Sequence, residues 1–254
     1  MSTWDPDRYL TYADERGRPF LDLVARIGAT SPTSVVDLGC GPGNMTRLLA
    51  ERWPEATVTG VDSSAEMLAK AAALGLETRL ADVHDWVESA PAGGVDVLVS
   101  NAMLQWVPGH LDLLPRLAEV VAPGGWLAFQ VPGNFGELSH TLREEVGAEP
   151  AYAPYLADVD RPASHDPADY WRVLDDAGLE VDAWETTYLH VLRGEDAVFD
   201  WISGTSLRPF RAALPDELWT PYAEELKARL RVAYPATSGR VLLPFRRIFV
   251  IARR

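Results

Sequence analysis

The stretch VVDLGCGPGN, residues 35–44, constrains the fold of this chain more than any other. An apolar run from Val35 to Leu38 ends in three glycines with one residue between each, and apolar residues at helical spacing follow from Met45. This order predicts a β-strand, a tight turn and the start of a helix. Such a turn aims backbone N–H groups and the positive end of a helix dipole at the carboxyl edge of a parallel sheet. We therefore expect a ligand site in an open α/β fold.

The alternation of strand and helix continues through the first half of the chain. Further strands are expected up to Asp62 and at 78–81, 95–99 and 126–131, with helices between them and one more before the turn, from Pro19. Asn44 can cap the helix after the turn, and Ser63 with Glu66 has capping-box spacing. This pattern predicts an α/β, Rossmann-like and mostly parallel sheet with helices on both faces.

The second half of the chain is less regular. Residues 133–165 show little pattern, 166–178 predict a capped helix, 195–235 have helical spacing, and strands are expected at 181–191 and 241–252. We predict one domain over residues 1–254. Its core spans 30–132, and the insertions at 133–165 and 195–238 form a helical lid over the sheet.

Composition excludes several classes of partner. The chain has 23 Lys and Arg against 37 Asp and Glu, a formal net charge of −14 that repels nucleic acid and anionic membranes. Cys40 is the only cysteine, so no intrachain disulfide can form. The histidines lack metal-ligand spacing, and we expect no metal. The absence of a signal-like start or a long apolar run predicts a soluble, cytoplasmic protein.

Two acids beside the glycines distinguish between cofactors. Asp62 ends the second strand, a position from which a carboxylate can accept both hydroxyls of a ribose, so a nicotinamide dinucleotide and S-adenosylmethionine both fit. The dinucleotide fingerprint would place glycine at position 44, where this chain has Asn44. Asp37 would repel a diphosphate but attract an ammonium group. Asp37 and Asp62 together therefore favour S-adenosylmethionine over a nicotinamide dinucleotide.

Residues 36–43, Val-Asp-Leu-Gly-Cys-Gly-Pro-Gly, resemble motif I of class I S-adenosylmethionine-dependent methyltransferases. Asp62, Asp82 and the Pro-Gly-Gly at 123–125 fall where later motifs of that family would lie. The resemblance implies that Gly39 and Gly41 line the methionine and ribose side, and that Asp82 and Val83 meet the adenine. It also implies that Asn101 lies near the methionine carboxylate or the sulfonium. The expected cofactor-binding residues are Asp37, Gly39, Gly41, Asn44, Asp62, Ser63, Asp82, Val83 and Asn101.

A closer resemblance extends over the whole chain. Trp4-Asp5-Pro6, Leu104-Gln105-Trp106, Leu207-Arg208-Pro209 and the Arg247 segment are similar to those of a methyltransferase family that esterifies a small unsaturated tricarboxylic acid. The resemblance implies an O-methyltransferase that acts on a carboxylate, with trans-aconitate as the expected substrate.

A carboxylate is already anionic at pH 7, so this reaction needs alignment and no general base. We accordingly expect no catalytic residue that transfers a proton. A tricarboxylate needs cations, and arginine matches a carboxylate bidentately. Arg208 and Arg247 are the expected anion ligands, and Tyr188, His190 and Tyr9 are expected to complete the substrate site.

Two alternative functions stay open at this point. One is methylation of a hydroxyl or carbon of a secondary metabolite, which would require a base such as His110. The other is a protein that binds S-adenosylmethionine without catalysis.

Overall fold

A computed structural model describes residues 17–254 of the chain. Trp4 and Tyr9, on which the sequence analysis drew, lie outside these residues. The chain forms two compact units. The sheet unit runs up to Pro132 and includes Ser164–Thr186 and Arg247–Arg254, and the helical unit comprises Gly133–Ala163 and Thr187–Arg246.

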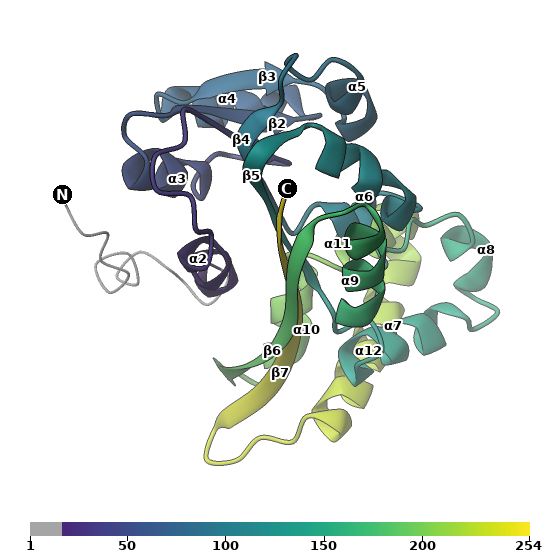
Figure 1. The fold of residues 1–254 in the computed structure, drawn as a ribbon. Coiled ribbons are helices and arrows are strands. Elements are labelled where there is room, and N and C mark those ends of the chain that lie inside the picture. Colours follow the sequence, from purple (N-terminus) through teal and green to yellow (C-terminus); the bar gives the residue numbers. More distant parts are fainter. Residues whose placement is uncertain (1–16) are drawn as a thin grey trace. The chain divides into compact units, whose positions relative to one another are not determined.

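The sheet has seven strands in the order β3-β2-β1-β4-β5-β7-β6 (Figure 1). The strands are β1 (Ser34–Leu38), β2 (Thr57–Asp62), β3 (Glu77–Leu80), β4 (Val95–Asn101), β5 (Val121–Pro132), β6 (Glu180–Arg193) and β7 (Arg240–Arg253). β1 to β5 pair in parallel and β7 runs antiparallel to β5. The predicted mostly parallel, open sheet is confirmed. The strand order reverses at β1, between β2 and β4, which is where open α/β sheets bind ligands.

Helices connect most of the strands. In the sheet unit they are α2 (Arg18–Ala25), α3 (Thr46–Arg52), α4 (Ala65–Ala73), α5 (Val83–Glu88), the short 3₁₀ helix η1 (Leu104–Trp106), α6 (His110–Glu119) and α9 (Pro167–Asp176). In the helical unit they are α7 (Leu138–Gly147), α8 (Ala153–Leu156), α10 (Ala197–Ser203), α11 (Arg208–Ala213) and α12 (Asp216–Ala233).

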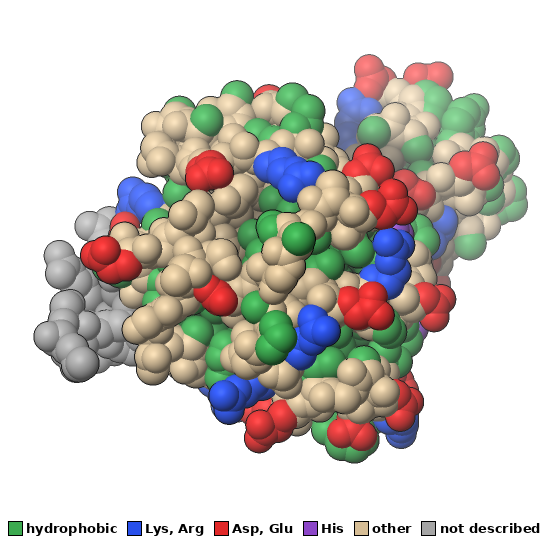
Figure 2. All heavy atoms as spheres, turned by 45° about the horizontal axis from the view of Figure 1, so that its top comes forward, with side chains coloured by type: hydrophobic (Ala, Val, Ile, Leu, Met, Phe, Trp, Pro, Cys, Tyr) green, Lys and Arg blue, Asp and Glu red, His purple; other side chains and the backbone are tan. Residues whose placement is uncertain are grey.

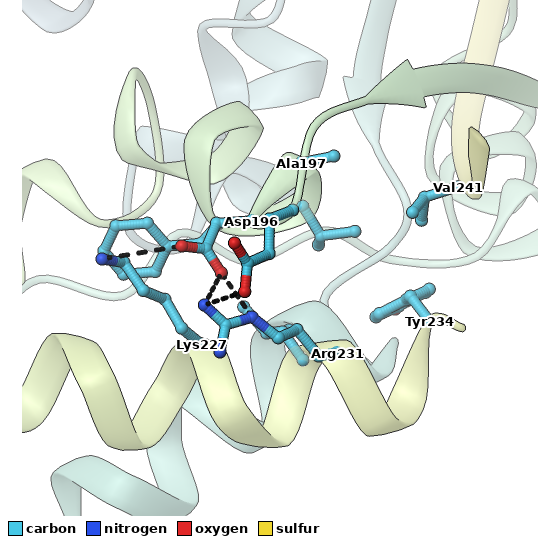
Figure 3. A pocket seen from close by; sticks show the side chains of 10 residues that line it. Asp196, Ala197, Lys227, Arg231, Tyr234 and Val241 are labelled. Carbon is cyan, nitrogen blue, oxygen red and sulfur yellow. Dashed lines mark hydrogen bonds and ion pairs between the residues drawn. The ribbon is translucent and has the colours of Figure 1, made fainter. Parts of the chain in front are cut away.

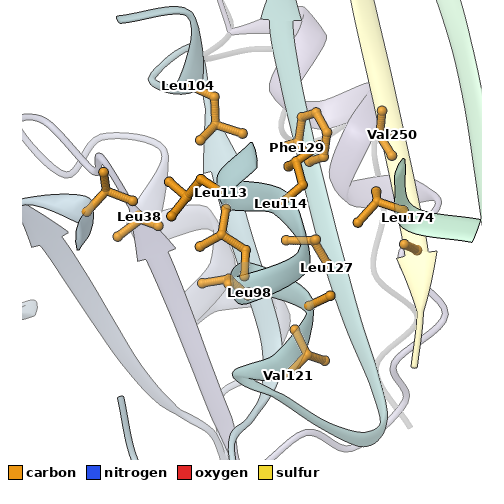
Figure 4. Close-up of a cluster of buried hydrophobic side chains, with 14 of the residues drawn as sticks. Leu38, Leu98, Leu104, Leu113, Leu114, Val121, Leu127, Phe129, Leu174 and Val250 are labelled. Atoms are coloured by element: carbon orange, nitrogen blue, oxygen red, sulfur yellow. The ribbon is translucent and has the colours of Figure 1, made fainter. Parts of the chain in front are cut away.

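Both faces of the central strands are buried. Leu98 and Phe129 belong to one cluster with Leu114 of α6 and Leu174 of α9, shown in Figure 4. Val97, the neighbour of Leu98 on β4, points to the opposite face and is also fully buried. Strands covered on two sides read as continuous apolar runs, which explains the composition of β1 and β4.

The helical unit has its own apolar core. It is built from α7, α8, α10, α11 and α12, with Tyr222, Phe210 and Leu226 almost fully buried at its centre. α7 is a helix that the sequence patterns did not predict, because it falls in the stretch 133–165. The role of this unit as a lid stays a prediction.

The largest difference between an expected and an observed strand boundary lies at β5. β5 begins at Val121 and not at Trp126, so the Pro-Gly-Gly at 123–125 lies inside the strand. The β4–β5 register shifts between Val95 and Val97, and this irregularity accommodates the extra residues.

The surface shows no segregation of charge on the face in Figure 2, where Lys and Arg side chains lie among Asp and Glu side chains. Among the residues that the structure describes, no helix is long and apolar enough to cross a membrane.

Candidate functional site

The glycine turn between β1 and α3 leaves room on one side only. Gly39, Gly41 and Gly43 all have positive φ, at 80°, 55° and 81°. A Cβ on Gly39 would lie 2.3 Å from Met103 Cγ, and one on Gly43 would lie 2.6 Å from Leu76 Cδ1. A Cβ on Gly41 would meet nothing within 4 Å. Gly39 and Gly43 are therefore required by packing, whereas Gly41 borders open space that a ligand can occupy.

Asp62, at the end of β2, is hydrogen-bonded to that turn. Its Oδ2 accepts from the backbone N–H of Gly41 at 2.9 Å, and its Oδ1 accepts from the backbone N–H of Ser64 at 2.8 Å. Each carboxylate oxygen has further lone pairs. The side chain is thus fixed beside Gly41 and can still accept hydrogen bonds from two ligand hydroxyls.

Asp37 is the buried acid of the site, with 2% of its surface exposed. Its Oδ2 accepts from the hydroxyl of Thr46 at 2.6 Å, and its Oδ1 has no partner among the described residues. Burial raises the pKa of Asp37 from 3.8 to about 6, the Thr46 hydrogen bond opposes the rise, and the charge of Asp62 adds to it. One oxygen of this buried carboxylate is therefore enclosed without a hydrogen-bond partner, and the cofactor role expected of Asp37 stays a prediction.

Two predicted helix caps are wrong. The N-cap of α3 is Met45, and the exposed Asn44 does not cap the helix. The N-cap of α4 is Ser64, whose Oγ accepts from the backbone N–H of Met67 at 3.3 Å, and Ser63 is exposed. In both cases the helix begins one residue later than expected. The cofactor roles assigned to Asn44 and Ser63 remain predictions.

Asp82 and Val83 follow β3 and begin α5. Asp82 Oδ1 accepts from the backbone N–H groups of His84 and Asp85 at 2.7 and 3.0 Å, and these bonds lower the pKa of Asp82. Asp82 is exposed and Val83 is buried. Their proposed contact with adenine stays a prediction.

Three side chains form a polar chain across β4, β5 and β7. Arg247 Nη1 donates to Gln130 Oε1 at 3.2 Å, and Gln130 Nε2 donates to Asn101 Oδ1 at 2.5 Å. Gln130 is 2% exposed and lies opposite Asn101 in the strand register. The structure therefore brings together Asn101 and Arg247, which the sequence assigned to different ligands. Gln130 itself was missed, because it reads as a single polar residue in an apolar strand.

The backbone after Asn101 adopts an unusual conformation. Ala102 has φ 54°, a region that residues with a side chain rarely adopt. Its N–H donates to the carbonyl of Gln130 at 2.9 Å and its carbonyl accepts from Gln105 Nε2 at 2.6 Å. Strained residues held by several bonds occur often at functional sites.

His110 is committed to structural hydrogen bonds. Its Nδ1 lies 3.2 Å from the carbonyl of Val107, and a carbonyl only accepts, so Nδ1 carries the proton. Nε2 then accepts from the hydroxyl of Tyr170 at 2.8 Å, and that hydroxyl accepts from the backbone N–H of His165. Burial lowers the pKa of His110. This arrangement leaves neither ring nitrogen available as a general base.

Arg208 lies in the helical unit at the start of α11. It is exposed and lines an open cavity of about 390 Å³ together with Arg211 and Trp219. Arg211 is paired with Asp216, and its guanidinium carbon lies 5.4 Å from the centre of the Trp219 ring. The cavity is large enough for a small organic anion.

Tyr188 and His190 alternate on β6 and are both buried in the helical unit, 6% and 4% exposed. The ring of His190 lies 4.6 Å from that of Trp201 and 5.4 Å from that of Phe245. These contacts serve packing, and the substrate role proposed for the two residues stays a prediction.

A second cavity in the helical unit is too small for a ligand. Its volume is about 10 Å³, and Figure 3 shows Asp196 reaching toward Arg231 and Lys227 across it. Arg231 Nη2 lies 2.6 Å from Asp196 Oδ1, and Lys227 Nζ lies 3.7 Å from Asp196 Oδ2. Among residues 17–254 no group of three His, Cys, Asp or Glu side chains could hold a metal ion.

Comparison with known proteins agrees with the fold. Residues 12–183 match the family model described as a methyltransferase domain. Phosphoethanolamine N-methyltransferase 2 of Haemonchus contortus, solved with S-adenosyl-L-methionine, superposes with a TM-score of 0.54 at 16% identity. The match covers 93% of this chain and 52% of that one, and at this identity it supports the fold alone. The open sheet, the acid-flanked glycine turn and the family model together define an S-adenosylmethionine-dependent methyltransferase of class I.

Curated relatives narrow the class. A trans-aconitate 2-methyltransferase of Mycobacterium sp. (strain KMS) is 50% identical over 98% of this chain and 99% of its own length. One of Streptomyces avermitilis is 49% identical over 100% and 98%, and one of Mycobacterium tuberculosis is 46% identical over 98% and 96%. The chain belongs to the trans-aconitate 2-methyltransferase family.

Proposed function

We propose that this protein transfers the methyl group of S-adenosylmethionine to one carboxylate of a small tricarboxylate, with trans-aconitate as the substrate. The observation that carries the proposal is the extent of the similarity to the curated relatives. Identity of 46–51% spans 98% or more of this chain, so the similarity includes the helical unit as well as the glycine turn. A shared sheet alone would support only the class of enzyme.

The residues of the sheet unit fit the methyl donor. Gly41 borders open space, Asp62 can accept from the ribose hydroxyls, and the charge of the buried Asp37, when ionised, would attract the α-ammonium group. S-adenosylmethionine supplies a methyl group activated by a positively charged sulfur. The acids beside the turn suit a cationic ligand and would repel a diphosphate.

His110, the general base that the alternative reaction would need, is occupied by other hydrogen bonds. Methylation of a hydroxyl requires removal of a proton, and the two ring nitrogens of His110 are already hydrogen-bonded to Val107 and Tyr170. A carboxylate acceptor requires no such step. Alignment of the reacting groups can contribute roughly 7–11 kcal/mol to lowering the barrier.

The substrate carboxylates require cations, which this acidic protein must supply locally. Arg247 is linked to Asn101 through Gln130 at the carboxyl edge of the sheet, and Arg208 lies at an open cavity of the helical unit. We propose that both arginines bind carboxylates that do not react, with Tyr188, His190 and Tyr9 completing the site. A bidentate arginine would weaken the nucleophilicity of the carboxylate it holds, so the reacting carboxylate should be the one left least tightly paired.

A methyl-transfer screen tests the proposal. The purified protein is incubated with labelled S-adenosylmethionine and, separately, trans-aconitate, cis-aconitate, citrate and a monocarboxylate, and the products are identified by mass and by sensitivity of the ester to alkali. We expect an alkali-labile monomethyl ester from trans-aconitate. An alkali-stable product from a hydroxylated compound would support the alternative enzyme, and cofactor binding without any product would indicate a non-catalytic protein.

A further inference from the structure

We propose that Gln130 is a positioning residue, which fixes Asn101 as a hydrogen-bond donor to a ligand carboxylate at the carboxyl edge of β4. The inference rests on the proposed function, because it assigns Asn101 a partner within the methyl-transfer site. It concerns three side chains of the sheet unit, which contact one another in sequence from Arg247 through Gln130 to Asn101.

The orientation of the Gln130 amide follows from the guanidinium of Arg247. A guanidinium carries only donors, so the atom of Gln130 that lies 3.2 Å from Arg247 Nη1 must be the acceptor Oε1. The other end of the amide is then the donor Nε2, which lies 2.5 Å from the Asn101 side chain. Asn101 must meet this donor with its carbonyl oxygen. Reversing either amide would set a donor against a donor.

The nitrogen of the Asn101 amide is left for a ligand. Asn101 is half-buried, and its Nδ2 has no hydrogen-bond partner among the described residues. This nitrogen is also not one of the polar atoms that those residues enclose without a partner. The strained backbone of Ala102 and its bonds to Gln130 and Gln105 hold the segment in place. The edge of β4 thus presents two N–H donors and no acceptor from this side chain.

This polarity selects the chemistry of the ligand group. An N–H donor is attracted to a carboxylate and repelled by a sulfonium, so Asn101 faces an anionic group. A carboxylate can come from the amino-acid part of the cofactor or from the tricarboxylate substrate. Both carboxylates would bind Asn101 in the same way. If the cofactor supplies the carboxylate, the affinity for the cofactor depends on Gln130; if the substrate supplies it, the affinity for the substrate does.

Two substitutions at position 130 separate orientation from packing. Gln130→Glu keeps the size of the side chain and the bond to Arg247, but a glutamate accepts at both oxygens. Asn101 must then turn its Nδ2 toward position 130 and present its carbonyl oxygen to the ligand. Gln130→Met removes both bonds and leaves the Asn101 amide without a preferred orientation. The glutamate variant should therefore be more impaired than the methionine variant.

The experiment measures preference for a carboxylate. Calorimetry gives the affinity of each variant for S-adenosylhomocysteine and for its decarboxylated analogue, which keeps the amino group, and steady-state kinetics gives the KM for trans-aconitate. If Asn101 binds the cofactor, Gln130→Glu should weaken S-adenosylhomocysteine about tenfold and the decarboxylated analogue little. If Asn101 binds the substrate, the KM should rise about tenfold with both cofactor affinities unchanged. Either effect should vanish in an Asn101→Ala background.

A control variant distinguishes reorientation of Asn101 from a general loss of structure. Gln105→Glu changes another buried glutamine near the same edge, whose amide donates to the carbonyl of Ala102 and not to Asn101. It should lower the Tm but keep the preference for a carboxylate. Equal weakening of both cofactor analogues by Gln130→Glu, or no change in any of the three measurements, would overturn the inference. If the parent protein methylates no tricarboxylate, the proposed function fails and the two cofactor affinities alone decide the role of Gln130.

Discussion

The carboxylate of Asp62 and the backbone N–H of Gly41 are joined by a 2.9 Å hydrogen bond that links the end of β2 to the glycine turn. Gly41 borders open space on its other side. One carboxylate thus holds the turn in place and stands beside the volume in which the cofactor is expected to bind.

Asp62→Ala should weaken S-adenosylmethionine binding by about 1–3 kcal/mol, the cost of removing hydrogen bonds to a charged group. The same change leaves the N–H groups of Gly41 and Ser64 without their acceptor, so part of the loss should appear as a lower Tm. Calorimetry on the folded variant measures the affinity directly. An unchanged affinity in a variant with a native circular dichroism spectrum would remove Asp62 from the site.

Gly41→Ala should separate backbone strain from ligand contact, with Gly75→Ala as the matched control. Both glycines have positive φ, and an added Cβ at either would meet nothing within 4 Å. Each variant should lose about 1 kcal/mol of stability, because alanine is disfavoured in this region. Only Gly41→Ala should also lose affinity for S-adenosylhomocysteine, since its Cβ occupies the ligand volume. Equal affinities in the two variants would place the ligand elsewhere.

Asp37 gives the protein a defined dependence on pH. The folded-state pKa of about 6 lies above the ordinary 3.8, so the protonated form is the one that folding favours. Its contribution to stability is full below pH 3.8 and is lost as the pH rises through 6; a rise of this size corresponds to about 3 kcal/mol. Asp37→Asn should therefore raise the Tm at pH 8 relative to the parent and change it little near pH 4.

The same carboxyl should make cofactor binding depend on pH in the opposite sense. An α-ammonium group is attracted to Asp37 only when the acid is ionised, so affinity for S-adenosylhomocysteine should fall as the pH drops below about 6. Asp37→Asn should bind more weakly at pH 8 and lose this dependence. A parent affinity that is constant from pH 5 to 8 would contradict the assignment.

Arg208→Met should raise the KM for trans-aconitate strongly, because it removes a cation from an acidic protein whose substrate carries three negative charges. A monocarboxylate analogue should be affected much less, and cofactor affinity should stay the same. Arg208→Lys should give an intermediate KM, since lysine restores the charge without the planar fork. Arg247→Met should also raise the KM, but it removes the donor to Gln130 and is not a clean control for cofactor affinity.

Tyr170→Phe and His110→Gln test whether a base is used. The Tyr170 hydroxyl donates to His110 and accepts from His165, so its removal should cost about 1–3 kcal/mol of stability with kcat nearly unchanged. His110→Gln should likewise retain turnover of a carboxylate substrate. Loss of kcat by several orders of magnitude in a folded His110 variant would instead indicate proton transfer and a hydroxyl acceptor.

The sequence predicted the sheet well because its signals are local. The apolar run 35–38, the glycines and Asp62 each act within a few residues of their own position. Asn44 failed as a cap because helix α3 begins only at Thr46, whose hydroxyl is bonded to Asp37 from the preceding strand. That bond depends on how the turn closes, which no local pattern shows.

Residues joined only by strand pairing could not be found in the same way. Gln130 is separated from Asn101 by 29 positions and from Arg247 by 117, and its importance follows from two side-chain contacts. Helix α7 was missed for a related reason. Its buried face includes the polar residues Ser139, His140 and Arg143. The Arg143 guanidinium donates to the carbonyl of Ser206, 63 positions away, a contact that no local pattern shows.

The burial of Asp37 has a consequence for the amount of this protein in a cell. At neutral pH the empty protein holds an ionised carboxylate with an unpartnered oxygen, and a bound cation would relieve that cost. The relieved cost strengthens binding, so the ligand stabilises the native state by mass action, and chains without ligand unfold and are degraded more readily. The half-life of the protein is thereby expected to follow the supply of methyl donor, so that a shortage removes the enzyme as well as slowing it.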